Sequence, residues 1–453
     1  MKMKKKFKFA TTHLIMLSFL LVILIGSVLL ALPISSRSGE AVSYIDALFT
    51  ATTATCVTGL VTLPTVSAWS VFGQAVILLL IQIGGLGVIT VVTGIMVALN
   101  RKIGIKDSHL IQDAFNLNTL SGLAKFIKKV IFGTFIVEGI GALLYMTVFV
   151  PEFGARGIWI SVFSSVSAFC NAGIDIVAEN SFCNYVHNPI INIVTSLLVV
   201  IGGLGYIVWW DLIRVFKLFK KQKFSAFKSL TLHTKIVLFT TATLIFAGAS
   251  VIFILEYNNP STMKDFTLFQ KIQASFFQSV TTRTAGLATI PQENLANATA
   301  FVSILLMFIG GSPVGTAGGV KTTTIAVLFA AALATIRNKN EVVLFNRTIT
   351  KEITKKAIAV TGMSFAILFL STVLLSVVTD APAIDILYEA ASATATVGLT
   401  RNLTSFINVW GKIILIFTMY LGRIGPISLA FAFSSRKVSQ NNIKDPIENI
   451  SVG

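Results

Sequence analysis

The chain is poor in charged residues and in cysteine, and both shortages narrow its class. Only 12% of its 453 residues are charged, whereas a soluble globular domain carries about 25%. Hydrophobic residues make up 54% of the chain, and its mean hydropathy is +0.82. The three cysteines, Cys56, Cys170 and Cys183, are too few for a disulfide framework. This composition excludes a small disulfide-bonded domain and indicates a membrane protein.

Histidine is also scarce, which argues against a metal site or an enzyme. The four histidines are scattered without the spacing of metal ligands, and no nucleophile–base pair is recognisable in the sequence. We therefore expect no enzymatic activity and no covalently or tightly bound cofactor.

The net charge of +17 could suggest nucleic-acid binding, but the placement of the charges argues against it. Lysine and arginine gather in a few segments that alternate with acidic connections, which is the positive-inside pattern. We expect a multi-pass protein of the cytoplasmic membrane, with both termini in the cytoplasm, the basic segments near the lipid bilayer, and no nucleic-acid partner. The basic segments are residues 2–8, 101–129, 214–235, 337–356 and 436–444.

Four similar segments recur along the chain, each with an aromatic residue ten positions ahead of a glycine. These glycines are Gly59, Gly173, Gly286 and Gly398, spaced 114, 113 and 112 residues apart. A second glycine cluster follows each one after a further 24–29 residues. Two linked motifs at a near-constant period indicate internal repetition. The second clusters begin at Gly84, Gly202, Gly310 and Gly422.

Each repeat combines two long apolar segments with a short one between them. Most long segments approach or exceed the roughly 20 residues that cross a bilayer as a helix, whereas the short ones fall in the class that enters without crossing. The residues that follow each short segment lack helical periodicity, and irregular backbone survives at membrane depth only beside a watery cavity or inside protein. We predict an all-α polytopic membrane protein with eight transmembrane helices, in four span–pore-loop–span repeats around one pseudo-fourfold pore.

The boundaries of these predicted parts follow from the hydropathy pattern. The long segments are residues 14–32, 71–99, 130–150, 189–212, 236–255, 299–336, 357–378 and 408–433. The short segments are residues 43–55, 158–169, 268–281 and 383–394. The predicted domains are residues 1–100, 101–216, 217–340 and 341–435, followed by a cytoplasmic tail at 436–453.

The tripeptides that end in the motif glycines are candidates for the walls of an ion filter. A dehydrated cation needs oxygen ligands in place of its water shell, and a ring of backbone carbonyls supplies them. Glycine adopts the φ angles that turn successive carbonyls inward, and a pore helix directs its negative end at the ion. One such tripeptide could equally be a helix C-cap, but four in one register favour a pore. The predicted cation-binding residues are Val57, Thr58, Gly59, Asn171, Ala172, Gly173, Thr284, Ala285, Gly286, Thr396, Val397 and Gly398.

The second long segment of the third repeat is interrupted. The 40 residues from Ala298 to Arg337 would make about 60 Å of continuous helix, twice the hydrocarbon thickness. Five glycines and a proline near the middle prevent a regular helix. We predict a flexible gating loop beneath the filter, with a simple packing kink as the alternative. The candidate gating residues are Gly310, Gly311, Ser312, Pro313, Gly315, Gly318, Gly319 and Lys321.

The same segment nearly matches a phosphate-binding loop over residues 315–322. Val320 stands where the last glycine of such a loop belongs, and no strand precedes it. We therefore expect no nucleotide site there.

Arg423 is a charge inside the last long segment, where it costs a few kcal/mol unless it finds partners or water. Its repeat position matches that of the interrupted segment, so we expect both to reach the pore axis at one level. There the guanidinium can donate hydrogen bonds to loop carbonyls and repel cations, and we count Arg423 among the gating residues. Snorkelling to the cytoplasmic face is the alternative.

At these residues the chain resembles the Ktr/Trk/HKT superfamily of potassium transporters, and the resemblance covers its whole length. Thr396-Val397-Gly398-Leu399 is the wall most similar to a potassium-channel filter, although the trailing Tyr-Gly is absent. With eight predicted spans, the chain looks like the membrane subunit of a Ktr system rather than a longer Trk protein. The resemblance implies potassium uptake with K⁺ in the filter, a homodimer with one pore per chain, and gating by a cytosolic nucleotide-binding ring subunit.

Other functions were weighed against potassium uptake. The sodium-preferring plant members of the superfamily carry serine in the first wall, so Gly59 favours potassium, whereas the unequal walls, with Asn171 in the second, predict looser selectivity than in a symmetric channel. A sodium-preferring or poorly selective conductor of the same fold is the first alternative. A secondary solute transporter is the second, but it predicts inverted repeats with one or two broken helices. An ATP-driven subunit would need a nucleotide domain, which we do not recognise in the sequence.

Overall fold

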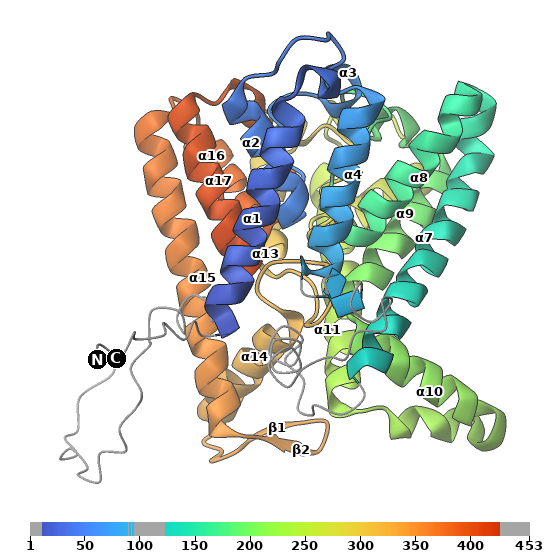
Figure 1. Cartoon of the computed structure of the whole chain (residues 1–453). Helices are drawn as coiled ribbons and strands as arrows, with labels where there is room; N and C mark the ends of the chain where they lie inside the picture. The colour runs from blue at the N-terminus through green and yellow to red at the C-terminus, as the bar shows by residue number, and fades with distance from the viewer. Residues whose placement is uncertain (1–10, 89, 92, 95–122, 426–453) are drawn as a thin grey trace, which may run out of the picture.

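The computed structural model describes residues 11–88, 90, 91, 93, 94 and 123–425, which form a bundle of helices (Figure 1). Four of these helices are single elements that are long and apolar enough to cross a membrane, and each begins one repeat. Large apolar side chains point away from the bundle along all four, as at Leu17, Phe132, Phe239 and Phe365. The four helices are α1 (Thr11–Ala31), α7 (Leu123–Phe153), α11 (Leu232–Glu256) and α15 (Lys351–Val378).

The second helix of each repeat is short, and its side chains are largely buried. These helices coincide within a few residues with the predicted short segments, so that prediction is confirmed. The polar start of one of them is held by a capping box, in which Thr267 and Gln270 each accept a hydrogen bond from the other's backbone N–H. The four helices are α2 (Tyr44–Cys56), α8 (Ala155–Cys170), α12 (Leu268–Thr281) and α16 (Ala383–Ala395).

In the first, second and fourth repeats a glycine interrupts the predicted last long segment at one position of the trailing glycine cluster; residues 95–99 and 426–433 of these segments lie outside the described residues. Gly87, Gly205 and Gly425 have φ angles of 85°, 87° and 87°, in the left-handed region where glycine carries no penalty. At Gly205 the chain turns by 100° from α9 into α10. The prediction of residues 189–212 as one long spanning segment was therefore wrong. The helices concerned are α4 (Val71–Leu86), α9 (Pro189–Gly203), α10 (Tyr206–Gln222) and α17 (Val409–Ile424).

The third repeat has the predicted interruption. Its last segment consists of α13 (Asn297–Phe308), irregular backbone over residues 309–321, and α14 (Thr322–Ile336). Within the described residues, four helices are long and apolar enough to cross a membrane, or five if α9 and α10 together make one span. The number of eight crossings therefore stays a prediction.

The four repeats close into a ring. The last helix of each repeat packs against the short helix of the next: α4 against α8, α9 against α12, α13 against α16, and α17 against α2. The final contact joins the fourth repeat to the first, and there Lys412 Nζ lies 2.6 Å from Asp46 Oδ1. This arrangement brings the ends of all four short helices together near the centre of the bundle.

The remaining elements are short. An antiparallel hairpin of β1 (Val342–Leu344) and β2 (Arg347–Ile349) is the exception to the all-α prediction, and it lies in a segment predicted as a basic connection. The boundary at residues 100 and 101, the basic segments 2–8 and 436–444, and the tail 436–453 lie outside the described residues. The other short elements are η1 (Pro33–Ser35), α3 (Thr65–Ala68), η2 (Cys183–Tyr185), η3 (Lys223–Ser229), η4 (Gln292–Asn294) and η5 (Thr404–Phe406).

Candidate ion pathway

The structure brings the four motif glycines into direct contact, in the order of the repeats. A Cβ atom added to Gly59, Gly173, Gly286 or Gly398 would lie within 2.9 Å of a carbonyl oxygen in a neighbouring wall. The carbonyls are those of Ala172, Ala285, Val397 and Thr58, each directly before the glycine of the next wall in the cycle. We call the four glycines, Gly59, Gly173, Gly286 and Gly398, the glycine ring. No side chain larger than hydrogen fits there without a shift of the backbone.

The backbone of the four tripeptides follows one pattern. The first residues, Val57, Asn171, Thr284 and Thr396, have φ angles of 55°, 59°, 68° and 52°. The glycines that end the tripeptides also have positive φ, from 65° at Gly173 to 102° at Gly59. Two left-handed residues in each tripeptide redirect the chain as it leaves a helix. All twelve predicted wall residues therefore lie together, at the negative ends of four helices.

A hydroxyl from each short helix supports its wall, and this feature was missed in the sequence. In the first and fourth walls the glycine N–H donates to the hydroxyl, from Gly59 to Thr53 at 2.9 Å and from Gly398 to Ser392 at 3.0 Å. In the second and third walls the hydroxyls of Ser167 and Thr281 instead donate to the carbonyls directly after the glycines. The signal was available, because a serine or threonine recurs five or six residues before every motif glycine.

The trailing glycine clusters allow the last helices to approach the walls. An added Cβ at Gly84, Gly202 or Gly422 would collide with a carbonyl four residues ahead of the wall glycine of the same repeat. Only a residue without a side chain permits this contact. In the first, second and fourth repeats the two linked motifs are therefore two sides of one packing interface, whereas Gly310 of the third repeat packs instead against Gly318 and Gly319.

The irregular segment 309–321, which we call the intramembrane loop, passes along one side of the walls. The Gly318 N–H donates to Thr284 Oγ1 at 3.2 Å. A Cβ atom added to Gly318 would collide with Thr396 Oγ1. The Thr316 hydroxyl donates to the Phe169 carbonyl at the end of α8. The loop thus touches the second, third and fourth repeats where the first residue of each tripeptide begins.

Arg423 binds the loop as the sequence suggested. Its Nη1 donates to the Thr316 carbonyl at 2.7 Å, and its Nη2 donates to the Gly84 carbonyl at 2.5 Å. The guanidinium therefore joins the loop to the last helix of the first repeat, and it does not snorkel. Lys321 donates to the Ala317 carbonyl at 2.7 Å and so stabilises the loop's own turn.

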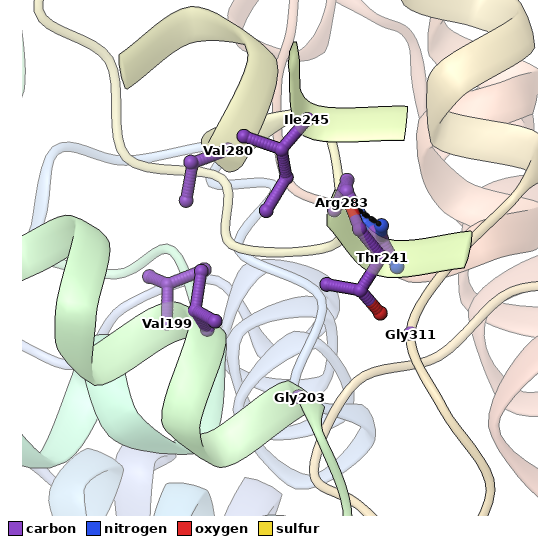
Figure 2. Close-up of a pocket in the computed structure, with 8 residues that line it drawn as sticks. Val199, Gly203, Thr241, Ile245, Val280, Arg283 and Gly311 are labelled. Atoms are coloured by element: carbon purple, nitrogen blue, oxygen red, sulfur yellow. Dashed lines mark hydrogen bonds between the residues drawn. The ribbon is translucent and has the colours of Figure 1, made fainter. Parts of the chain in front are cut away.

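A second buried guanidinium, Arg283, holds the other end of the loop and was not singled out in the sequence. Figure 2 shows it beside Thr241 and Gly311 in a small cavity. Its Nη2 donates to the Gly310 carbonyl at 2.9 Å and its Nη1 to the Thr241 carbonyl at 3.3 Å. The side chain is 5% exposed, and no carboxylate forms an ion pair with it among the described residues. The available signal was that Arg283 takes the repeat position that Cys56 and Cys170 occupy in the first two repeats.

The buried carboxylates lie behind the walls. Glu138 of α7 accepts a hydrogen bond from Gln82 at 3.3 Å and contacts the Cys170 thiol, which answers the open question of its partner. Glu389 of α16 accepts hydrogen bonds from the hydroxyls of Thr400 and Thr404 in the segment after the fourth wall. Both carboxylates thus position elements around the glycine ring.

Comparison with known proteins agrees with this architecture. The family model of TrkH, described as a cation transport protein, matches residues 2–444. The chain belongs to the TrkH family of cation transport proteins. It is therefore a membrane transport protein and not an enzyme, and the predicted superfamily resemblance is confirmed.

Two known proteins match this chain over nearly their whole length. It is 39% identical to the Ktr system potassium uptake protein B of Bacillus subtilis, over 100% of this chain and 99% of that protein. It is 36% identical to the potassium/sodium uptake protein NtpJ of Enterococcus hirae, over 100% and 99%. The crystal structure of the potassium transporter TrkH from Vibrio parahaemolyticus has the same fold, with a TM-score of 0.73 at 14% identity, covering 96% of this chain and 87% of that one.

Proposed function

We propose that the chain takes up potassium across the cytoplasmic membrane through the glycine ring, with K⁺ bound by carbonyls of the four tripeptides. The observation that carries this proposal is the closed cycle in which each glycine meets a carbonyl of the next wall. Carbonyl rings of this kind replace the hydration shell of a cation. The name of the Bacillus subtilis relative, a potassium uptake protein, supports K⁺ as the ion.

The intramembrane loop is the gate in this proposal. It is held at both ends by guanidinium groups, Arg423 at Thr316 and Arg283 at Gly310, and Gly318 touches two walls. A loop in this place restricts passage to one side of the ring, and its five glycines make displacement inexpensive in strain. The two positive charges beside it also repel cations until the loop moves.

Control of this gate is assigned to a separate cytosolic nucleotide-binding subunit, with the chain acting as a homodimer whose termini both lie in the cytoplasm. The support is the name of the same relative, which describes protein B of a Ktr system, and the basic segments of this chain, such as 214–235. Purified chain alone should show no binding of ATP or NAD by calorimetry. Micromolar binding to the isolated chain would overturn this assignment.

A sodium-preferring or poorly selective conductor is the second candidate, because one relative is named a potassium/sodium uptake protein. The two candidates are separated by uptake of rubidium and of sodium into liposomes that contain the purified chain at a fixed density. Potassium uptake predicts rubidium flux well above sodium flux and rescue of a potassium-uptake-deficient cell at low external K⁺. Equal fluxes, or sodium flux above rubidium flux, would favour the second candidate.

A further inference from the structure

Residues 206–229 leave the bundle sideways at one end. The chain turns by 100° between α9 and α10, so a helix that follows the long axis of the bundle continues into one that runs roughly across it. Figure 1 shows α10 pointing outward near the start of α7. The spanning helix α11 begins at Leu232, directly after this segment. The segment therefore lies at the level where two spanning helices enter the membrane.

The inner side of this segment is fixed by good packing and hydrogen bonds. Val208 and Val215 are buried with 0% and 2% exposure. Asp211 accepts hydrogen bonds from the backbone N–H and the hydroxyl of Thr231, both at 2.9 Å. Arg214 binds Asp211 at 2.6 Å and the Ser229 carbonyl at 2.8 Å. These contacts hold α10 and η3 as one unit in a defined direction.

The outer side of residues 206–229 carries both large apolar and basic side chains. Phe216 is 74% exposed, Phe227 48% and Ile213 43%, and the Phe216 ring stacks on Phe219 at 6.5 Å. Residues 206–235 contain seven lysines and arginines but a single acid, the internally bound Asp211. Exposed phenylalanines among lysines, on a helix at the end of a membrane bundle, are typical of helices that lie in the bilayer interface.

Two tryptophans, Trp209 and Trp210, lie at the start of α10, where the spanning helices enter the membrane. The Trp209 indole donates to the Ile201 carbonyl at 2.8 Å, and Lys129 of α7 lies 5.3 Å from the Trp210 ring centre. Tryptophan is enriched where a membrane protein crosses from hydrocarbon to water. The start of α10 therefore packs against α7 at Gly133, next to the lipid-facing Phe132, which is 70% exposed.

We propose that α10 and η3 form an interfacial anchor that binds anionic phospholipid headgroups, with Phe216 and Phe227 in the acyl boundary and Lys217 and Lys228 at the phosphates. The charge complementarity and the packing of α10 against the lipid-facing helix α7 identify the bilayer as the occupant. The anchor fixes the position of the α9 end, whose Gly202 and Gly203 carbonyls accept hydrogen bonds from the Thr316 and Ser312 N–H groups of the intramembrane loop. Lipid charge then acts on the loop through a short and rigid connection.

The first test measures where position 216 lies. A Phe216→Cys variant, in a Cys183→Ser background, is labelled with an environment-sensitive fluorophore and reconstituted as purified chain in vesicles of phosphatidylcholine and phosphatidylglycerol. We expect quenching by a nitroxide near the lipid headgroup and protection from aqueous iodide. Quenching by iodide alone would overturn the anchor. Protection from both quenchers would overturn it too, because a second copy of the chain would then cover the site.

The second test measures the preference for charge. Spin-labelled phosphatidylglycerol and phosphatidylcholine are compared for association with the intact chain, and Lys217→Glu should lower the relative affinity for phosphatidylglycerol about five-fold at low salt. Lys264→Glu is the matched control, because Lys264 is exposed in the connection after α11, at the opposite end of that spanning helix. An equal loss in both variants would show that only net charge matters and would overturn the headgroup site.

Discussion

At the scale of single residues, Gly59 shows how a missing side chain determines the ring. Its φ is 102°, and an added Cβ would lie 2.7 Å from the Ala172 carbonyl oxygen. A Gly59→Ser substitution must therefore displace that carbonyl, at a strain of about 1–3 kcal/mol. Since about 1.4 kcal/mol changes an equilibrium tenfold, we expect the rubidium-to-sodium flux ratio in liposomes to fall by about that factor.

The matched control for this prediction is Gly362→Ser in α15, where an added Cβ meets no atom within 4 Å. That variant should keep the parent flux ratio. Thermal unfolding in detergent would show whether both variants remain folded. A folded Gly59→Ser protein with the parent ratio would remove the first wall from the filter assignment.

Asp175, two residues after the second wall, gives a prediction for pH. Burial raises the pKa of its carboxyl from 3.8 to about 6, although a hydrogen bond from Ser181 and the backbone N–H groups of Val177 and Ala178 oppose the shift. A carboxyl with a raised pKa in the folded state favours folding most below its ordinary pKa, and this contribution is lost as pH rises through about 6.

We therefore expect Asp175→Asn to become progressively more stable relative to the parent as pH rises from 4 to 7. The measurement is the difference in thermal midpoint between the two proteins in detergent at each pH, which cancels the titration of other groups. A difference that does not change with pH would show that Asp175 titrates normally.

Arg283 shows what the sequence could not reveal at this scale. Its position follows from the repeat alignment, but the residue type there changes from cysteine to arginine without a compensating acid nearby in the sequence. Only the fold reveals that its partners are the backbone carbonyls of Thr241 and Gly310. Every residue has a backbone carbonyl, so the sequence does not show which carbonyls bind a buried arginine. The arginine itself can be read from the sequence, but its role cannot.

At the scale of elements, the intramembrane loop is held by few strong contacts. A hydrogen bond to a charged group contributes roughly 1.5–3 kcal/mol, and Arg423→Ala removes the one to Thr316. We expect basal rubidium flux to rise about tenfold or more, with an unchanged rubidium-to-sodium ratio, because the hydrogen bonds of Arg423 go to Thr316 and Gly84 and not to the four tripeptides. Liposome uptake at matched protein density measures both quantities.

The control for the loop is Arg347→Ala, since Arg347 is an exposed arginine of β2. It should conduct like the parent. If Arg423→Ala also conducts like the parent, the loop is a packing kink and the gate lies elsewhere.

The elements themselves were only partly predictable. The short helices followed from the length of the short segments, because segments of about 10–14 residues are too short to cross a membrane. The break after Phe308 followed from five glycines and a proline in a 40-residue segment. The 100° turn at Gly205 did not, since Gly202-Gly203-Leu204-Gly205 is compatible with a continuous apolar helix until packing selects a left-handed glycine. The β1–β2 hairpin was missed as well, because its strands are only three residues long.

At the scale of the whole molecule, the contact of α17 with α2 decides whether the ring is closed. Lys412 and Asp46 form its ion pair at 2.6 Å, with side chains 16% and 12% exposed. Contacting pairs of this kind show coupling of about 0.5–3 kcal/mol. We expect Lys412→Met and Asp46→Asn each to lower the thermal midpoint, and the double variant to lose less than the sum of the two.

Lys264→Met serves as the control for loss of one exposed lysine and should leave the midpoint nearly unchanged. Strictly additive effects of the two single variants would mean that the pair does not stabilise the closed ring.

The sequence predicted that four similar repeats surround one pore, but not how they contact one another. Equal spacing of four glycines indicates four similar walls, but it does not state which helix meets which. That information lies in the packing of each last helix on the following short helix, which depends on the shapes of buried surfaces rather than on any motif. The hydroxyls of Thr53, Ser167, Thr281 and Ser392 are a middle case. Their periodicity is visible in the sequence, but their use as acceptors in the first and fourth walls and as donors in the second and third is not.

The pairing of Asp46 with Lys412 also has a consequence for biosynthesis. The two residues are 366 positions apart, and ribosomes add about 5–20 residues per second. The first repeat therefore waits roughly 20–70 s in the membrane with its acid uncompensated and its flank open, until the last helix is inserted. Nascent chains that stop before Val409 lack α17, so α2 keeps its side surface and Asp46 without the partner that closes the ring.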